Sequence, residues 1–258
     1  MMQKVKKVKN RIYSDYFMNN RFEEYEQMII DFKNKGFNFA QIKERDTIDD
    51  KNKKYVFIRH DIDSEPKVAE KMFQIEQKHG VTSTYYFRQC SLDIELAKKM
   101  IASGVEVGYH YEEIADYAKK NNIMSSDEIR LKMDDIKKIF INNTMEFEKK
   151  IGCKIETVVS HGDWVNRKLK ITNKTIVTSE VKRELNLKFE GYEVEKNLDF
   201  RIADRGYPDF WYPNSPKNII EDDNMKVGLV LIHPRQWCSS PLERLKQDSL
   251  RIIEAIRY

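Results

Sequence analysis

Short runs of apolar and β-branched residues alternate with helical repeats along this 258-residue chain, and this alternation constrains the fold more than any other feature. Strands that alternate with helices favour a largely parallel sheet, either closed as a barrel or open with helices on both faces. The runs predicted as buried strands are Tyr55–Arg59, Thr82–Phe87, Val105–Tyr109, Thr157–Ser160, Thr175–Thr178 and Val227–Ile232.

Helical periods lie between several of these runs. Val68, Met72 and Ile75 recur at spacings of four and three, as on the buried face of a helix. The last helix is the best marked, with Ser240 as its N-cap and Pro241 at its first position. Its predicted apolar face consists of Leu242, Leu245, Ile252 and Ile256.

Residues 1–50 carry an apolar pattern at helical spacing, which predicts a helix packed outside the sheet before the first strand. The pattern consists of Phe22, Tyr25, Met28, Ile29 and Phe32. The chain length fits a single α/β barrel of about 250 residues. We therefore expect one domain, with a helical extension over residues 1–50 and a barrel over residues 51–258. The Lys-, Asn- and Glu-rich stretch Val165–Asn197 is predicted as a long excursion between strands.

The apolar stretches are too short for a membrane-spanning protein. The longest, Val227–Ile232, is far below the roughly 20 residues that a spanning helix needs. The segment Met1–Arg11 lacks the apolar core of a signal peptide, so we expect a cytoplasmic protein without a transmembrane segment. The three cysteines are widely spaced and form no CxxC pair, so any metal would need His and carboxylate ligands.

The formal net charge of +4, from 46 basic and 42 acidic residues, gives little support to nucleic-acid binding, and no nucleic-acid partner is expected. The clearest basic cluster consists of Lys4, Lys6, Lys7, Lys9 and Arg11. This cluster could contact phosphates or an anionic membrane surface, although charge runs at termini are usually solvated arms. Peripheral contact with a membrane therefore stays open.

Four of the five histidines directly follow predicted strands. They are His60, His110, His161 and His233. Because the carboxyl ends of parallel strands share one edge of the sheet, residues far apart in sequence can meet there. A lone histidine after a strand is more often a hydrogen-bonded structural residue, but four of them beside an Asp-x-Asp make a functional site the better hypothesis.

Asp61 and Asp63 stand two positions apart at the end of the first predicted strand. In an extended backbone both side chains point the same way, and two crowded carboxylates repel unless a cation intervenes. A divalent metal could bind one carboxylate and leave the other free as a base. The alternative is a structural role, in which one of the two caps the helix that begins near Glu65.

The segments IRHDIDSEPKVAEKMFQIEQKHGVTSTYYFR and GVEVGYHYEE resemble the NodB-type polysaccharide deacetylases, carbohydrate esterase family four. The resemblance covers about Lys54 to Trp237 and implies an α/β fold, an irregular (β/α)7-type barrel, with a metal-dependent deacetylase activity. The segment LNLKFEGYEVEKNLDFRIADRG is similar to the WbmS-like branch, which is found with bacterial surface-polysaccharide genes.

Taken position by position, the resemblance implies roles for four residues. Asp61 would be the catalytic base, and Asp63 and His110 would bind the metal. His233 would assist the leaving group.

One position departs from the family pattern. The second metal histidine of the family lies four residues after the first, and this chain has Ile114 there. Isoleucine cannot coordinate a metal, and hydrolytic zinc usually keeps three protein ligands. We expect His161 to supply the third ligand, with Glu112 or Glu113 as the alternatives.

The supporting residues are less constrained by the sequence. His60 or Asp204 could orient a ligand or His233, and a structural, backbone-bonded role suits His60 equally well. Side chains that could contact the sugar or a charged group on it are Arg88, Tyr111, Arg235 and Trp237.

These features predict a hydrolase, most simply a Zn²⁺ enzyme, that removes an N-acetyl or similar acyl group from an amino sugar of a surface polysaccharide or its precursor. Two alternatives stay open. One is an amidohydrolase that opens a cyclic imide or ureide on the same scaffold. The other is a sugar-binding relative without turnover, which the missing histidine at Ile114 favours. The sequence does not predict the oligomeric state.

Overall fold

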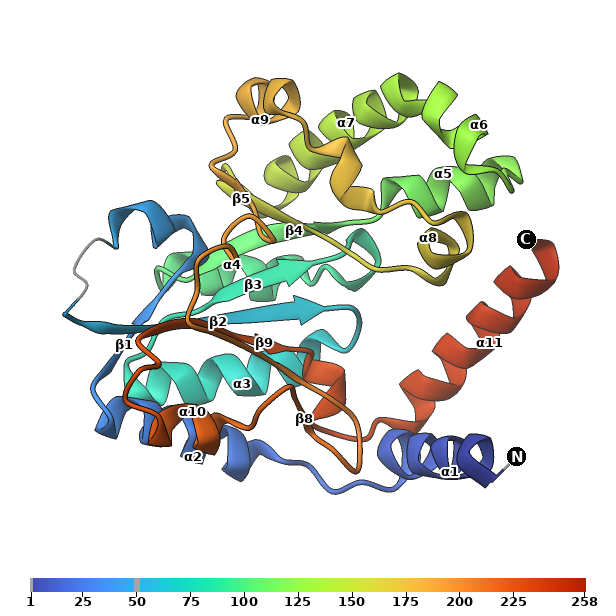
Figure 1. Ribbon diagram of the computed structural model, residues 1–258. Coiled ribbons are helices and arrows are strands. Elements are labelled where there is room, and N and C mark those ends of the chain that lie inside the picture. Colours follow the sequence, from blue (N-terminus) through green and yellow to red (C-terminus); the bar gives the residue numbers. More distant parts are fainter. Residues whose placement is uncertain (1, 49–51) are drawn as a thin grey trace.

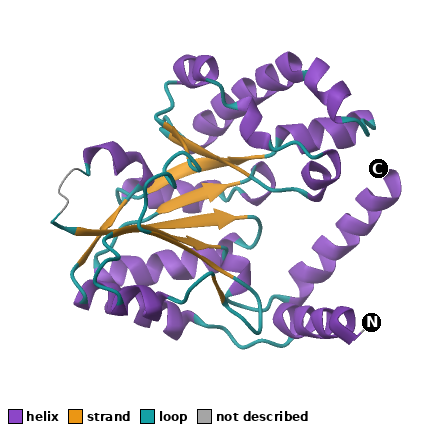
Figure 2. Cartoon of the chain, viewed as in Figure 1, coloured by secondary structure: helices purple, strands orange, loops and turns teal. Residues whose placement is uncertain are grey.

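A nine-stranded sheet forms the centre of the fold, with helices packed on its outer faces (Figures 1 and 2). The computed structural model describes residues 2–48 and 52–258. The strands are β1 (Phe37–Ala40), β2 (Lys54–Ile62), β3 (Thr84–Phe87), β4 (Glu106–Tyr111), β5 (Thr157–Ser160), β6 (Phe189–Glu190), β7 (Phe200–Asp204), β8 (Trp211–Tyr212) and β9 (Val227–Ile232).

The strand order is β6-β5-β4-β3-β2-β9-β7-β8, and β1 pairs with the first half of β2. Every pair is parallel except β7 with β8. The sheet curls into a half-barrel, which confirms the predicted α/β class of the (β/α)7-barrel type. The carboxyl ends of the parallel strands all lie at one edge, as the arrowheads of β2 and β3 show in Figure 1.

The α-helices connect the strands and cover the sheet. They are α1 (Met2–Tyr16), α2 (Phe22–Asn34), α3 (Pro66–His79), α4 (Ile94–Ala102), α5 (Glu113–Asn121), α6 (Ser126–Leu131), α7 (Met133–Ile151), α8 (Trp164–Leu169), α9 (Ser179–Leu185), α10 (Pro216–Glu221) and α11 (Pro241–Arg257). In the described residues, four 3-10 helices add to them: η1 (Ile42–Thr47), η2 (Gln89–Ser91), η3 (Asn173–Ile176) and η4 (Pro234–Gln236). None of the described helices is both long enough and apolar enough to cross a membrane.

Five of the six predicted strands are present, and two of them run past their predicted ends. Strand β4 ends at Tyr111, so His110 lies inside it and not after it. Strand β2 continues past Arg59 to Ile62, so that His60 and Asp61 lie inside the strand and not after it. Because side chains alternate along a strand, Arg59 and Asp61 share one face of the sheet and His60 points to the other. This extension decides which side chains can reach the site.

The predicted strand Thr175–Thr178 is wrong. Residues 173–176 form η3, and Thr178 is the N-cap of α9, with its hydroxyl accepting from the backbone N–H of Val181 at 3.4 Å. Threonine side chains that bond to nearby backbone groups compete with strand pairing, and here the local bond prevails. The sequence pattern also missed the short strands β1, β6 and β8, and strand β7.

The interior of the half-barrel is narrow at Gly108 in β4. A Cβ atom built there would lie 2.4 Å from Cε1 of Tyr86 and 2.7 Å from the carbonyl oxygen of Thr157. The hydroxyl of Tyr86 is 2.6 Å from Oγ1 of Thr157, so the ring bridges from β3 to β5 over the glycine. Glycine is therefore required for the sheet to close around this ring.

The two ends of the chain lie on the outside of the sheet. The predicted N-terminal helix corresponds to α2, which buries Tyr25, Met28, Ile29 and Phe32. At the other end, α11 begins after Ser240, but the Ser240 side chain accepts no capping bond from the helix. The side chain of Ile256 lies outside the described residues. The division into residues 1–50 and 51–258 stays a prediction.

Candidate active site

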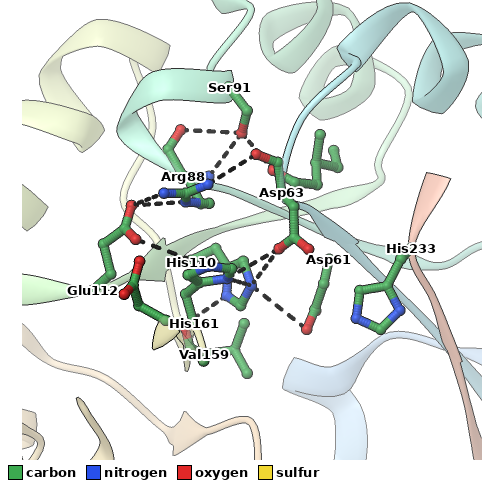
Figure 3. A network of polar contacts seen from close by, with 12 residues as sticks. Asp61, Asp63, Arg88, Ser91, His110, Glu112, Val159, His161 and His233 are labelled. Carbon is green, nitrogen blue, oxygen red and sulfur yellow. Dashed lines mark hydrogen bonds and ion pairs between the residues drawn. The ribbon is translucent and has the colours of Figure 1, made fainter. Parts of the chain in front are cut away.

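The carboxyl ends of strands β2, β4, β5 and β9 bring five polar side chains together (Figure 3). Each was singled out from the sequence because it stands at or just after a predicted strand. They are Asp61, Asp63, His110, His161 and His233.

Asp63, His110 and His161 meet through their side-chain atoms. Oδ1 of Asp63 lies 3.0 Å from Nδ1 of His161 and 3.3 Å from Nε2 of His110. The two ring nitrogens are 3.2 Å apart. These side chains come from β4 and from the loops that follow β2 and β5, and they form a group that could hold a metal ion.

The backbone of the neighbouring strand sets the ring orientation of His110. Nδ1 lies 3.0 Å from the carbonyl oxygen of Val159 in β5, and a carbonyl oxygen can only accept a hydrogen bond. Nδ1 therefore carries the proton, and in the neutral ring the lone pair of Nε2 faces Asp63 and His161. Histidines that coordinate metals are commonly fixed by such a bond from their second ring nitrogen.

The chemistry of this group fits a divalent cation. Burial raises the pKa of the Asp63 carboxyl, but His161 and His110 outweigh this effect and hold the pKa well below its usual value. Asp63 is therefore ionised at neutral pH, as a carboxylate ligand must be. One carboxylate and two imidazoles match the oxygen and nitrogen ligands that Zn²⁺ takes in catalytic sites.

Asp61 adjoins this group but is held by a different partner. Its Oδ1 and Oδ2 accept hydrogen bonds from Nε and Nη2 of Arg59 at 2.7 and 2.6 Å, and both side chains are buried. Burial raises the pKa of Asp61, but the Arg59 charge, with His110 next, outweighs it and lowers the pKa. Oδ2 also lies 3.7 Å from Nε2 of His110. Asp61 is thus an ionised carboxylate at the side of the candidate metal group.

The sequence analysis missed Arg59, which is the partner of the Asp61 carboxylate. The available signal is the strand period, since residues two apart on an extended strand share a face. Neither Asp61 nor Asp63 caps the helix that follows β2, because the N-cap residue of α3 is Glu65.

His233 follows β9 and is oriented by Asp204, the last residue of β7. Nδ1 lies 2.7 Å from Oδ1 of Asp204, and Oδ2 accepts from the His233 backbone N–H at 2.7 Å and from the Trp237 indole N–H at 2.8 Å. Burial lowers the pKa of His233, but the charge and hydrogen bond of Asp204, followed by Asp63 and Asp61, outweigh it and raise the pKa to about 9. At neutral pH His233 is therefore an imidazolium beside Asp61 (Figure 3).

Arg88 and Glu112 form an ion pair above the same group. Nη2 and Nε of Arg88 lie 2.5 and 2.7 Å from Oε1 of Glu112. Nη1 of Arg88 donates to the backbone carbonyl of Asp63 at 3.2 Å. The pair therefore ties the loop after β2 to the end of β4.

A second group that could hold a metal ion consists of Glu112, His161 and Asp163. Oε2 of Glu112 lies 3.9 Å from Nε2 of His161. Both carboxylates of this group already have cationic partners, since Glu112 pairs with Arg88 and Asp163 lies 3.3 Å from Nζ of Lys119. A cation would have to compete with these ion pairs, so we favour the first group.

Other side chains singled out from the sequence lie outside the cluster. His60 points to the opposite face of β2, where Nε2 is 2.8 Å from Oε1 of Glu76 and the ring stacks on Tyr85 at a centroid distance of 4.1 Å. Tyr111 is buried, and its hydroxyl donates to Glu190 at 3.2 Å.

Three further residues singled out from the sequence also lie outside the Asp63–His110–His161 group. Trp237 is fully buried and contacts Asp204 through its indole N–H. Arg235 follows β9 in η4, and its carbonyl accepts from Arg244. Glu113 is buried in α5 and belongs to neither group of described residues that could hold a metal ion.

A hollow of the described surface lies elsewhere. It has a volume of about 630 Å³ and is lined, among others, by Phe37, Thr82 and Gly104 at the amino ends of the strands. The chemistry at the carboxyl edge, and not the size of this hollow, identifies the candidate site.

Fold and site together define a class: an α/β half-barrel with an Asp-His-His group that could hold a metal ion at the carboxyl edge of its sheet. No family model matches the chain, and no curated protein matches it.

Solved structures do match. A family 4 carbohydrate esterase from Bacillus anthracis is 15% identical with a TM-score of 0.39, over 92% of this chain and 88% of that chain. A wild-type CE4 family pseudoenzyme from Bacillus anthracis is 14% identical with a TM-score of 0.39, over 76% of this chain and 62% of that chain. A mutant of this pseudoenzyme with restored enzymatic activity is 15% identical with a TM-score of 0.37, over 77% and 64%.

The match thus covers less than two thirds of the pseudoenzyme structures. By their descriptions these proteins belong to the carbohydrate esterase family that the sequence resembles. The comparisons do not concern the WbmS-like branch.

Proposed function

We propose that the protein is a Zn²⁺-dependent hydrolase that removes an N-acetyl or similar acyl group from an amino sugar of a surface polysaccharide or its precursor. One observation carries the proposal. The Asp63–His110–His161 group adjoins both an ionised carboxylate, Asp61, and an imidazolium, His233. Amide hydrolysis needs a base for water and an acid for the amine, and this site offers one of each.

Asp63, His110 and His161 would hold the ion. When bound, Zn²⁺ supplies a Lewis acid for the acyl oxygen and lowers the pKa of water.

Asp61 takes the proton of the attacking water. Its ion pair with Arg59 keeps it ionised and fixes the plane of the carboxylate, while each oxygen retains a lone pair for the incoming proton. The carboxylate therefore receives the proton without having to turn away from its partner.

His233 gives a proton to the nitrogen of the leaving amine. Asp204 engages Nδ1, so the proton on Nε2 is the one available for transfer. An amine leaves poorly unless it is protonated, and loss of such an acid costs about 10²- to 10⁴-fold in rate. Of the side chains expected to contact the sugar, Arg88 and Arg235 keep partial exposure.

Acetate release from N-acetylated amino sugars tests the proposal. Protein stripped with a chelator and reloaded with Zn²⁺ would be assayed on N-acetylglucosamine oligomers and on nucleotide-linked N-acetyl amino sugars. We expect Zn²⁺-dependent release. Asp61→Asn should keep its zinc, measured by elemental analysis, and lose at least about 10²-fold in rate. Asp63→Ala should lose both zinc and turnover, while the exposed control Asp127→Asn should change neither.

Other outcomes point to other functions. Zinc binding with ring opening of a cyclic imide, and no acetate release, would support the amidohydrolase alternative. Sugar binding without hydrolysis of any substrate would support the non-catalytic alternative. Full activity of Asp61→Asn would rule out the proposed base.

A further inference from the structure

Helix α11 lies beyond the carboxyl edge of the sheet, the edge that carries the candidate site (Figure 1). Its first turn is fixed by Arg244, whose Nη2 lies 3.3 Å from Oε1 of Glu65 and whose Nε lies 3.6 Å from Oδ1 of Asp15. At the other end, the ring of Tyr258 packs edge-on against Trp164 at a centroid distance of 5.5 Å. The helix is therefore held to the body of the protein at both ends.

The apolar face of α11 points to solvent. Leu242, Leu245 and Ile252 are 85%, 55% and 61% exposed, whereas Arg244 is 2% exposed on the side that packs against the protein. Helix α2 shows the ordinary orientation, with its apolar residues buried. Single exposed apolar residues are normal, but a whole exposed face marks an interaction surface.

Helix α1 extends this surface. It is joined to α11 by an ion pair of 2.8 Å between Arg11 and Asp248, and by a hydrogen bond of 3.3 Å from the hydroxyl of Tyr16 to the same carboxylate. The exposed apolar side chains of both helices and of Phe17, which follows α1, are here called the docking face. They are Val5, Val8, Ile12, Tyr13, Phe17, Leu242, Leu245, Leu250, Ile252 and Ile253.

Cations accompany the docking face. Helix α1 contains five basic residues and one acidic residue. Lys6, Lys7 and Lys9 are exposed, while the side chain of Lys4 lies outside the described residues. Helices that lie in the plane of a lipid surface combine an apolar face with Lys and Arg, because the former enters the headgroup boundary and the latter attract anionic lipids.

We propose that α1 and α11 dock the protein onto an anionic lipid bilayer. A second copy of the chain is a poorer occupant of this face, since the pairing would bring two strongly basic α1 helices together and like charges across an interface cost free energy. An anionic lipid surface complements both the apolar side chains and the charge of α1. The readout is lipid binding, so the test is independent of the proposed hydrolysis.

Vesicle co-sedimentation tests the docking face. Wild-type protein would be mixed with vesicles of phosphatidylcholine alone and of phosphatidylcholine with 30% phosphatidylglycerol. We expect at least ~10-fold stronger binding to the anionic vesicles, weakened by added salt. The double variant Leu245→Ser with Ile252→Ser should lose at least ~10-fold in binding, because it removes two exposed apolar contacts. A variant with Lys6, Lys7 and Lys9 changed to Glu should lose the preference for phosphatidylglycerol.

The control is Leu131→Ser in α6, which is 85% exposed outside the docking face and should bind like wild type. Since all the substituted side chains are exposed, far-UV circular dichroism should show each variant to be folded. Failure of wild type to sediment with either vesicle would overturn the proposal. Light scattering that shows a dimer abolished by Leu245→Ser with Ile252→Ser would also overturn it, and would assign the face to a second copy.

Discussion

Nε2 of His110 and Nδ1 of His161 lie 3.2 Å apart, although 51 positions separate the two residues in the chain. The register of the sheet produces this contact, since His110 pairs with Val159 in β5, two residues before His161. Because Nδ1 of His110 faces the carbonyl oxygen of Val159, its Nε2 is the ring nitrogen that faces His161 and the candidate metal group. A metal ion bound by this group would therefore contact both nitrogens at once.

Zn²⁺ should stabilise the fold through this pair. At 100 times its dissociation constant, a ligand of the folded state adds about 2.7 kcal/mol to the free energy of unfolding. His161→Ala removes one of the three proposed ligands, so most of this gain should vanish at the same Zn²⁺ concentration. Urea denaturation with and without Zn²⁺ measures the effect. His79→Ala, whose ring pairs with Glu26, should respond like wild type; equal stabilisation of His161→Ala would contradict the assignment.

Replacement of Arg59 should destabilise the protein strongly. Arg59→Met leaves the Asp61 carboxylate buried without its cation, which costs about 3–5 kcal/mol of unfolding free energy. Addition of Asp61→Asn should recover part of this loss, because a neutral amide needs no counter-charge. The matched control is Arg201→Met, which breaks a more exposed pair with Glu195 and should cost less than about 1 kcal/mol. Similar losses for the two arginines in urea denaturation would refute the prediction.

The His233–Asp204 pair should give a pH dependence of stability. The pKa of His233 is raised to about 9 from 6.5, so its stabilisation is fully present below pH 6.5 and is lost as the pH rises through about 9. Asp204→Asn removes the carboxylate and should lower the His233 pKa. NMR titration of the His233 imidazole in the metal-free protein measures its pKa in wild type and in Asp204→Asn. An unchanged pKa in the variant would show that Asp204 is not the cause.

Glu113 should produce a pH dependence of the same sign at lower pH. Burial raises its pKa from 4.5 to about 7, although bonds from Tyr109 and Asn143 partly offset this. The folded state then binds more protons than the unfolded state, so stability falls by of order 3 kcal/mol as the pH rises from 4.5 to 7. Glu113→Gln should flatten this part of the profile, and the exposed control Glu128→Gln should leave it unchanged. Parallel profiles for wild type and Glu113→Gln would disprove it.

The sequence predicts the sheet and the edge at which the polar residues collect, because both follow from period and order. Runs such as Val227–Ile232 coincide with strands, and histidines that follow parallel strands lie at one edge of the sheet. His60 is the exception, because β2 continues past it and turns its side chain to the other face. What sequence cannot supply is long-range pairing. Strand β8 has two residues and forms only against β7, so no local pattern marks it.

In the candidate site, too, the sequence predicts which residues share an edge of the sheet but not which side chains contact one another. Convergence of Asp63, His110 and His161 at one edge was expected from the strand order, but the contacts that orient them were not. The apolar run in the sequence ends at Arg59, and the contact of Arg59 with Asp61 appears only because β2 continues to Ile62. The Asp204–His233 bond depends on β7 lying next to β9, a neighbour relation that no spacing in the sequence reveals.

The uninterrupted segment from Arg59 to Asp63 contains the proposed base, Asp61, the arginine that holds it in place (the clamp), and the proposed metal ligand Asp63. Half of the candidate chemistry is thus written in five adjacent residues, with the relation between clamp and base set by the pleat of a single strand. Such a unit is portable: a graft onto the end of another buried parallel strand would carry its internal geometry along. His110 and His161 could not be transferred in this way, because they become neighbours only after distant parts of the chain have folded together.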